Sequence, residues 1–138
     1  MNRELDGIAP REVLYVEDHP TNVQLMRALF KRRPHLELVI AIDGNEARRA
    51  ANQLQPSLLL LDLRLPDCHG AELLQQLRQL DGWAEIPAVA VTAEPAFATE
   101  GTGFCEIWRK PLDLGFVLSR LDHWAAQPQG VGAPVAAG

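Results

Sequence analysis

The stretch "SLLLLD", residues 57–62, is the strongest indication of the fold and raises the first functional question. Its leucines show no alternation of apolar and polar residues, which is typical of a strand covered on both faces, as in a parallel sheet. Asp62 ends this run, and a buried carboxylate is costly unless it is paired or coordinated. Either Asp62 lies at a strand end by accident, or it is there for chemistry.

The segments on either side of this stretch alternate between strand and helix patterns. Short apolar runs predict strands over residues 12–18, 36–41, 57–62, 86–92 and 104–108. Apolar residues at helical spacing predict helices over 20–33, after Asp43, over 70–80 and after Asp113. This repeated alternation predicts an α/β fold, a doubly wound parallel sheet with helices on both faces.

Composition limits the classes of partner. The 138 residues fit one domain with a single sizeable core, and the net charge of −5 argues mildly against direct nucleic-acid binding. No apolar run approaches a membrane span, and "MNRELDGIAP" lacks the apolar region of an export signal, so we expect a cytoplasmic protein. The two cysteines, Cys68 and Cys105, are expected to be free thiols.

The predicted domain covers residues 11–125. Residues 1–10 form an N-terminal extension, and residues 126–138 a Pro/Gly/Ala-rich tail that we expect to be disordered.

Polar side chains gather where the predicted strands end. They are Glu17, Asp18, Asp62, Thr92 and Lys110. In a doubly wound sheet the carboxyl ends of the strands form one rim, and binding sites lie there. The sequence therefore predicts that these five side chains meet.

Three carboxylates at one rim repel one another, which raises their pKa values unless cations offset the charge. Oxygen ligands with open positions suit Mg²⁺, and Lys110 adds a fixed positive charge. Together a metal ion and an ammonium group can neutralise the oxygens of a phosphoryl group while a carboxylate attacks it. Asp62 is the best nucleophile candidate, and Thr92 can donate a hydrogen bond to a phosphoryl oxygen.

Four stretches together resemble one known family. They are "VEDHPTN" (16–22), "LLLLDLRLPDCHG" (58–70), "AVAVTA" (88–93) and "WRKP" (108–111). Each alone is weak, but all four occur in order on the expected elements, and the spacings from Asp18 to Asp62 and from Asp62 to Thr92 match the family. Over about residues 11–125 the chain resembles the receiver domain of bacterial response regulators in two-component signalling.

The resemblance implies a flavodoxin-like fold of five strands in the order 2-1-3-4-5. It implies that Asp62 is the phosphoacceptor, with Thr92 and Lys110 contacting the phosphoryl group. It implies Mg²⁺ bound by Asp18, Asp62 and the backbone carbonyl of Arg64, with Glu17 acting mainly through water. It also implies a cis peptide bond between Lys110 and Pro111.

The implied partners are a histidine kinase or phosphotransfer protein, and an unknown output protein. The chain would not be an enzyme in the usual sense, although a receiver catalyses its own phosphorylation and slow dephosphorylation. The sequence leaves open a homodimer, and whether the chain stands alone or belongs to a larger hybrid kinase.

The segment "AEPAFATEGTGFCEIWR" (93–109) departs from the family pattern. It is shorter by about one helical turn, and Pro95, Gly101 and Gly103 disfavour a long helix, so we expect the family's fourth helix to be truncated. Ile107 occupies a position that is normally aromatic, with Trp108 beside it. Because both changes affect the usual output surface, we expect an unusual output, or none beyond accepting phosphate.

Two further sets of residues could modify the site. His19 and His69 could lie near the acidic rim and tune its pH response. Arg64, two residues after Asp62, could shield or block attacking water. A basic cluster late in the first helix, comprising Arg27, Lys31, Arg32 and Arg33, is either a solvated face or a docking surface for an acidic partner.

Three other classes of protein fit this sequence less well. A haloacid-dehalogenase-type phosphatase needs a second acid two residues after its nucleophile, where this chain has Arg64. A flavodoxin-like FMN binder needs a Ser/Thr/Gly-rich phosphate loop after the first strand, where this chain has "VEDHPTN". A receiver-like interaction module that is never phosphorylated is disfavoured by the complete set of rim residues but remains open.

Overall fold

The leucine run forms the central strand of the sheet. The computed structural model describes residues 10–127, and in it β3 (Leu58–Asp62) is buried along its whole length. The other strands are β1 (Arg11–Val16), β2 (Leu36–Ala41), β4 (Ala88–Thr92) and β5 (Glu106–Arg109). All pairs are parallel, and the order is β2-β1-β3-β4-β5, which confirms the predicted doubly wound sheet.

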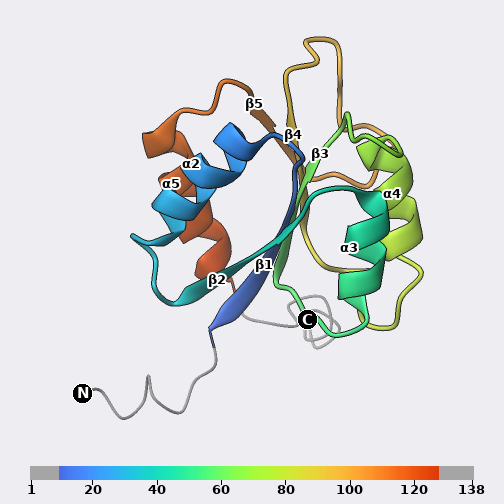
Figure 1. Cartoon of the computed structure of the whole chain (residues 1–138), viewed down its shortest axis with the longest axis horizontal. Coiled ribbons are helices and arrows are strands. Elements are labelled where there is room, and N and C mark those ends of the chain that lie inside the picture. Colours follow the sequence, from blue (N-terminus) through green and yellow to red (C-terminus); the bar gives the residue numbers. More distant parts are fainter. Residues whose placement is uncertain (1–9, 128–138) are drawn as a thin grey trace.

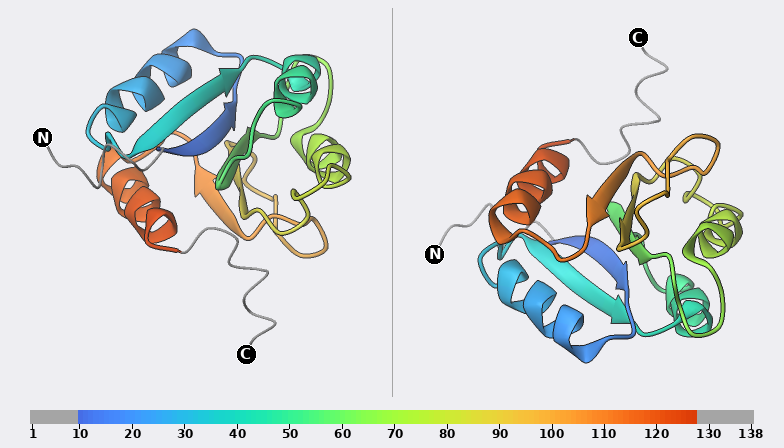
Figure 2. Two further views of the ribbon diagram at one scale, coloured as in Figure 1. Left: turned by 90° about the horizontal axis from the view of Figure 1, so that it is seen from below. Right: turned by 90° about the horizontal axis from the view of Figure 1, so that it is seen from above.

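The helices cover both faces of this sheet. They are α2 (Pro20–Phe30), α3 (Gly44–Ala51), α4 (Gly70–Leu77) and α5 (Leu114–Ala125). Figure 1 shows α2 and α5 on one face and α3 and α4 on the other, and the two views of Figure 2 agree. No helix within residues 10–127 is long and apolar enough to cross a membrane.

The absence of alternation in β3 follows from these two layers. Leu59 and Leu61 belong to the core beneath α3 and α4, whereas Leu58 and Leu60 belong to the core beneath α2 and α5. Each face of the strand is therefore buried in its own apolar layer, and each buried leucine contributes about 2 kcal/mol of transfer free energy. A strand of this kind ends at a charged residue only where something accommodates the charge.

Helix starts follow the predicted chemistry, and two helix ends come earlier than expected. The carboxylates of Asp43 and Asp113 accept hydrogen bonds from the backbone N–H groups of Glu46 (2.7 Å) and Phe116 (2.8 Å). The predicted helices over 20–33 and 70–80 each end three residues sooner. In both, the final N–H groups bond to carbonyls only three residues back, which tightens the chain into a turn.

The chain between β4 and β5 contains no helix. Truncation was expected, but residues 93–105 form only turns, bends and extended chain, seen as a loop in Figure 1. Gly101 and Gly103 have φ of 72° and 89°, a left-handed conformation that interrupts a helix. Arginines hold the loop instead: Arg109 donates to the Phe97 carbonyl (3.0 Å) and Arg78 to the Gly103 carbonyl (3.3 Å).

The predicted strand over 104–108 shifts to β5, Glu106–Arg109, because Phe104 donates its N–H to the Thr102 hydroxyl. The proposed extension 1–10 and tail 126–138 fall mainly outside the described residues, so the predicted division into 1–10, 11–125 and 126–138 stays a prediction.

Gly70 is the tightest point of this architecture and supplies a test. A Cβ at Gly70 would lie 2.4 Å from the Asp62 carbonyl oxygen and 2.9 Å from the Leu63 Cα, both backbone atoms. Gly70→Ala should therefore lower the free energy of unfolding by about 1–3 kcal/mol or more. Gly115→Ala in α5 is the control, because its nearest contact is an ordinary 3.5 Å and alanine is favoured in helices by up to about 1 kcal/mol. Urea denaturation measures both; equal effects would contradict the packing argument.

Candidate functional site

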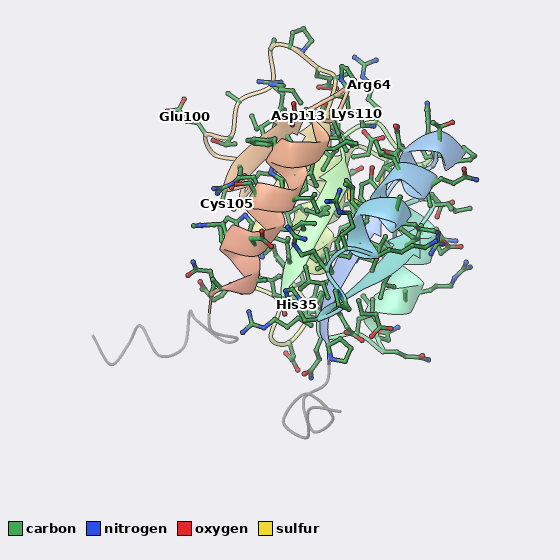
Figure 3. All side chains as sticks on the ribbon, turned by 90° about the vertical axis from the view of Figure 1, so that its left-hand side faces the viewer. His35, Arg64, Glu100, Cys105, Lys110 and Asp113 are labelled. Atoms are coloured by element: carbon green, nitrogen blue, oxygen red, sulfur yellow. The ribbon has the colours of Figure 1, made fainter. Side chains whose placement is uncertain are left out.

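The five predicted polar residues meet at the carboxyl ends of β1, β3, β4 and β5. Lys110 lies at this rim together with Arg64, at the upper end of Figure 3. The register explains the convergence: β3 pairs Asp62 with Val91 of β4, one residue before Thr92, and Thr92 pairs with Arg109, one residue before Lys110.

Asp62 uses both carboxylate oxygens. Its Oδ1 accepts a hydrogen bond from the Arg64 N–H at 3.1 Å, and its Oδ2 lies 3.0 Å from the Lys110 Nζ. The residue is only 6% exposed. This buried carboxylate is the last residue of β3, a strand that is buried along its whole length.

Glu17 is fully buried and is held from three sides. Its Oε1 accepts from the Tyr15 hydroxyl at 3.0 Å and lies 2.9 Å from the Lys110 Nζ, and its Oε2 accepts from the His19 N–H at 3.1 Å. Tyr15 was not predicted as part of the site. The signal was available, because residues two apart on a strand share a face and Tyr15 precedes Glu17 by two.

Lys110 therefore bridges two buried carboxylates. Burial alone would lower the pKa of Lys110, but Glu17 and Asp62 outweigh it and raise that pKa, so the ammonium stays charged. The peptide bond between Lys110 and Pro111 is cis, as the resemblance implied.

The two carboxylates differ in their ionisation. Burial alone raises the pKa of Glu17, but hydrogen bonds from Lys110, the His19 N–H and Tyr15 outweigh it and hold that pKa below its ordinary value. For Asp62, burial and the neighbouring charge of Glu17 prevail over Lys110 and raise the pKa. Burial, with the charge of Glu17, also raises the pKa of Tyr15, which stays a hydroxyl donor.

Asp18 offers the oxygen best suited to bind a cation. Its Oδ1 is buried and receives no hydrogen bond from residues 10–127. A bare buried carboxylate oxygen is costly, and a bound cation would satisfy it. Asp18 does not cap the helix that follows it, because the N-cap residue of α2 is His19, whose side chain makes no capping hydrogen bond.

The donors near Asp18 fit a hard cation. Glu17, Asp18 and His19 each offer one ligand atom, and these atoms all lie within 4.8 Å of one another. Mg²⁺ prefers carboxylate oxygens to imidazole, so within this group the oxygens of Glu17 and Asp18 are the better donors. His19 Nδ1 lies 3.4 Å from the Asp18 Oδ1, so His19 does reach the rim.

Thr92 is buried at the end of β4, and its hydroxyl accepts a hydrogen bond from the Glu94 N–H at 2.9 Å. Glu94 also pairs with Arg64, their Oε2 and Nε atoms lying 3.0 Å apart. Sequence reasoning singled out Arg64 but missed Glu94. The spacing held a hint, since Glu94 follows Thr92 by two residues just as Arg64 follows Asp62.

β5 carries an aliphatic residue, Ile107, where receiver domains normally have an aromatic one, and its aromatic residue, Trp108, lies on the other face. Ile107 packs against the core beneath α3 and α4. Trp108 is fully buried on the opposite side, and its indole N–H donates to Glu106 at 2.7 Å. Arg120 of α5 donates to both oxygens of that carboxylate, at 2.6 and 2.7 Å. The aromatic residue of β5 is thus fixed beneath α5.

Residues 13–112 match the family described as "Response regulator receiver domain". The chain belongs to this family. The polar-differentiation response regulator DivK of Brucella anthropi is 34% identical over 112 residues, covering 76% of this chain and 88% of that protein. The family assignment confirms the resemblance and sets aside the phosphatase and FMN-binding classes.

Solved structures agree. The receiver domain of the sensor histidine kinase PA1611 from Pseudomonas aeruginosa, described with a magnesium ion in its active-site cleft, superposes with a TM-score of 0.74 at 26% identity. That match covers 84% of this chain and 98% of the other. CheY4 of Vibrio cholerae superposes with a TM-score of 0.74 over 84% of this chain and 99% of its own, and at 21% identity it supports the fold alone.

The raised pKa of Asp62 has a measurable consequence for stability. The folded state binds the Asp62 proton more tightly than the unfolded chain, so ionisation of Asp62 costs folding free energy as the pH rises. In metal-free buffer at pH 7, Asp62→Asn should raise the free energy of unfolding by about 1 kcal/mol. The gain should shrink as the pH falls through the raised pKa of the folded state and be lost below about pH 4, where the carboxyl is protonated in both states. Urea denaturation at both pH values measures this.

The control for Asp62→Asn is Asp81→Asn, an exposed carboxylate far from the rim along the chain, which should change stability by less than about 0.5 kcal/mol. A loss of stability at pH 7 in the Asp62 variant would contradict the prediction.

Proposed function

We propose that this receiver domain accepts a phosphoryl group on Asp62 and signals through contacts with other proteins. The observation that best supports the proposal is the position of Lys110, 2.9 Å from Glu17 and 3.0 Å from Asp62. An ammonium group held there faces the point where a phosphoryl group on Asp62 would carry its charge. Thr92 lies on the neighbouring strand, with its hydroxyl available as a donor.

The transfer step uses residues of the rim. An oxygen of Asp62 would form a bond to phosphorus while the bond from phosphorus to the donor's imidazole nitrogen breaks. The departing nitrogen keeps the electron pair of that bond, and the imidazole leaves neutral, with one proton on the ring that is already on the other nitrogen or is taken from solvent. Lys110 would offset charge on the phosphoryl oxygens, and Thr92 would donate a hydrogen bond to one of them. Asp62, held by the Arg64 N–H and Lys110, is oriented before the donor arrives.

A magnesium ion is the implied cofactor, and the donor set fits it. Asp18, Asp62 and the Arg64 backbone carbonyl would hold the ion, with Glu17 acting mainly through water. When bound, Mg²⁺ supplies positive charge that neutralises phosphoryl oxygens. The buried Asp18 Oδ1 supports this assignment, because no described residue donates to it.

The donor would be a histidine kinase or a phosphotransfer protein in the cytoplasm. Output would be a protein contact whose partner is unknown. DivK of Brucella anthropi, of which this chain covers 88%, is named as a response regulator.

The test of the proposed function is intrinsic fluorescence with Mg²⁺ and then beryllofluoride, a mimic of the phosphoryl group. Trp108 is buried two residues before Lys110 and should report occupancy of the site. We expect a saturable, Mg²⁺-dependent change that Asp62→Asn abolishes. No response, together with no phosphorylation by acetyl phosphate, would instead favour an interaction module that is never phosphorylated.

Magnesium alone should stabilise the fold through Asp18. At 10 mM Mg²⁺ the wild-type melting temperature should rise by about 2–6 °C, as expected for a ligand present well above its dissociation constant. Asp18→Asn should remove most of that rise, while Asp81→Asn should keep it. The measurement is a thermal melt by circular dichroism with and without the ion. An undiminished rise in the Asp18 variant would contradict the assignment.

A further inference from the structure

The loop between β3 and α4, residues 63–69, presents the backbone of Arg64 to the site. The Arg64 N–H donates a hydrogen bond to the Asp62 Oδ1 at 3.1 Å, and the Arg64 carbonyl is one of the oxygens proposed above for Mg²⁺. Within the loop, the Leu65 N–H donates to the Cys68 carbonyl at 3.2 Å. Because that bond joins two residues of the loop, it does not fix the loop relative to the neighbouring elements.

The side chain of Asp67 fixes this loop to another helix. Its two carboxylate oxygens accept hydrogen bonds from the N–H groups of Gly44 (2.9 Å) and Asn45 (2.8 Å), the first two residues of α3. A helix leaves its first N–H groups without partners of its own, so these donors are available to a carboxylate. The hydrogen bonds outweigh the effect of burial and hold the pKa of Asp67 below its ordinary value, so the carboxylate is ionised at neutral pH. Figure 1 shows α3 and α4 side by side, and the loop that leads into α4 passes the start of α3.

Close packing also keeps the loop against α3. A Cβ at Gly44 would lie 2.5 Å from the Cys68 Sγ and 3.2 Å from the Asp67 Oδ1, so only glycine fits between the helix and the loop. Arg48, about one turn further along α3, has its Nη2 3.8 Å from the Asp67 Oδ2. The loop therefore cannot come closer to α3, and the hydrogen bonds of Asp67 oppose its movement away.

A second aspartate caps α3 through residues of the helix's own segment. The Asp43 Oδ1 accepts a hydrogen bond from the Glu46 N–H at 2.7 Å, and the Glu46 carboxylate accepts one from the Ile42 N–H at 2.9 Å. This reciprocal arrangement is sufficient to start a helix. Asp67 is therefore not needed to form α3, and its two hydrogen bonds serve mainly to place the loop.

We propose that Asp67 is a positioning residue for the site. By binding the N-terminus of α3, it holds the β3–α4 loop so that the Arg64 N–H stays on Asp62 and the Arg64 carbonyl is in place for Mg²⁺. The inference rests on the proposed function, because Asp67 acts only through Arg64. Removing a group that orients a metal ligand weakens metal binding by about 10–100-fold, and one of several ligands is affected here, so the lower end of that range is expected.

The experiment compares Asp67→Ala with Asp43→Ala in the full chain. Each variant removes one carboxylate and its hydrogen bonds from the start of α3, so their effects on charge and on the helix are matched. The first readout is the dissociation constant for Mg²⁺, measured from the intrinsic tryptophan fluorescence. Asp67→Ala should weaken Mg²⁺ binding by about tenfold, whereas Asp43→Ala should change it by less than about twofold.

The second readout requires no metal. Amide hydrogen exchange, followed by NMR in metal-free buffer, measures how often the loop opens. The Leu65 N–H, which bonds to the Cys68 carbonyl, should exchange faster in Asp67→Ala than in wild type or Asp43→Ala. Asp67→Asn loses the same charge as the alanine variant but keeps an acceptor oxygen, so it should recover most of the Mg²⁺ affinity.

Wild-type Mg²⁺ affinity in Asp67→Ala, an equal loss in Asp43→Ala, or unchanged exchange at Leu65 would each overturn the inference while the proposed function stands. If Asp67→Asn binds Mg²⁺ as weakly as Asp67→Ala, the lost charge is responsible and the inference is also wrong. If the wild-type protein itself shows no response to Mg²⁺ and beryllofluoride and is not phosphorylated, the proposed function fails and the inference fails with it.

Discussion

The site depends on one cation held between two buried carboxylates. Without Lys110, Glu17 and Asp62 would face each other with no opposing charge, and a buried pair of like charges is costly. Lys110 follows β5, an edge strand that pairs only with β4. The end of β5 must therefore stay in register with β4 for the site to exist. This requirement explains why the helixless segment before β5 is tied down by Arg78 and Arg109.

The same requirement shapes the surface around β5. Losing the helix between β4 and β5 removes packing from one side of the strand, while the other side gains a network. The Glu106 carboxylate accepts hydrogen bonds from the Trp108 indole N–H, from two N–H groups of Arg120, and from the Trp124 indole N–H at 3.3 Å. These bonds tie β5 to α5. Leu114 and Phe116, at the start of α5, are among its exposed apolar side chains.

The sequence predicted the architecture well because its strongest signals are local. The apolar run without alternation predicted the parallel sheet. The aspartates at their N-termini marked the starts of α3 and α5. The polar residues at the strand ends predicted five side chains at one rim. Helix ends were less predictable. After Phe30 and Leu77 the backbone hydrogen bonds change from a span of four residues to a span of three, and no residue type marks this change. Tyr15 and Glu94 were missed since each acts through a neighbour two residues away, and either has an ordinary structural explanation when read alone.

The charged groups at the rim lower the stability of the fold, and burial of the two apolar cores offsets this loss. Asp18 has an oxygen without a donor among the described residues, and Asp62 is harder to ionise than a free aspartate. Neither feature helps folding, and a protein selected for stability alone would replace both. Each becomes favourable once positive charge arrives at the rim. Lys110 pairs with both Glu17 and Asp62, but only the pKa of Glu17 is lowered, so the unfavourable charge remains on Asp18 and Asp62. These are the two residues that we propose bind a metal ion and a phosphoryl group. The residues with unfavourable electrostatic free energy are thus the ones that the proposed chemistry uses.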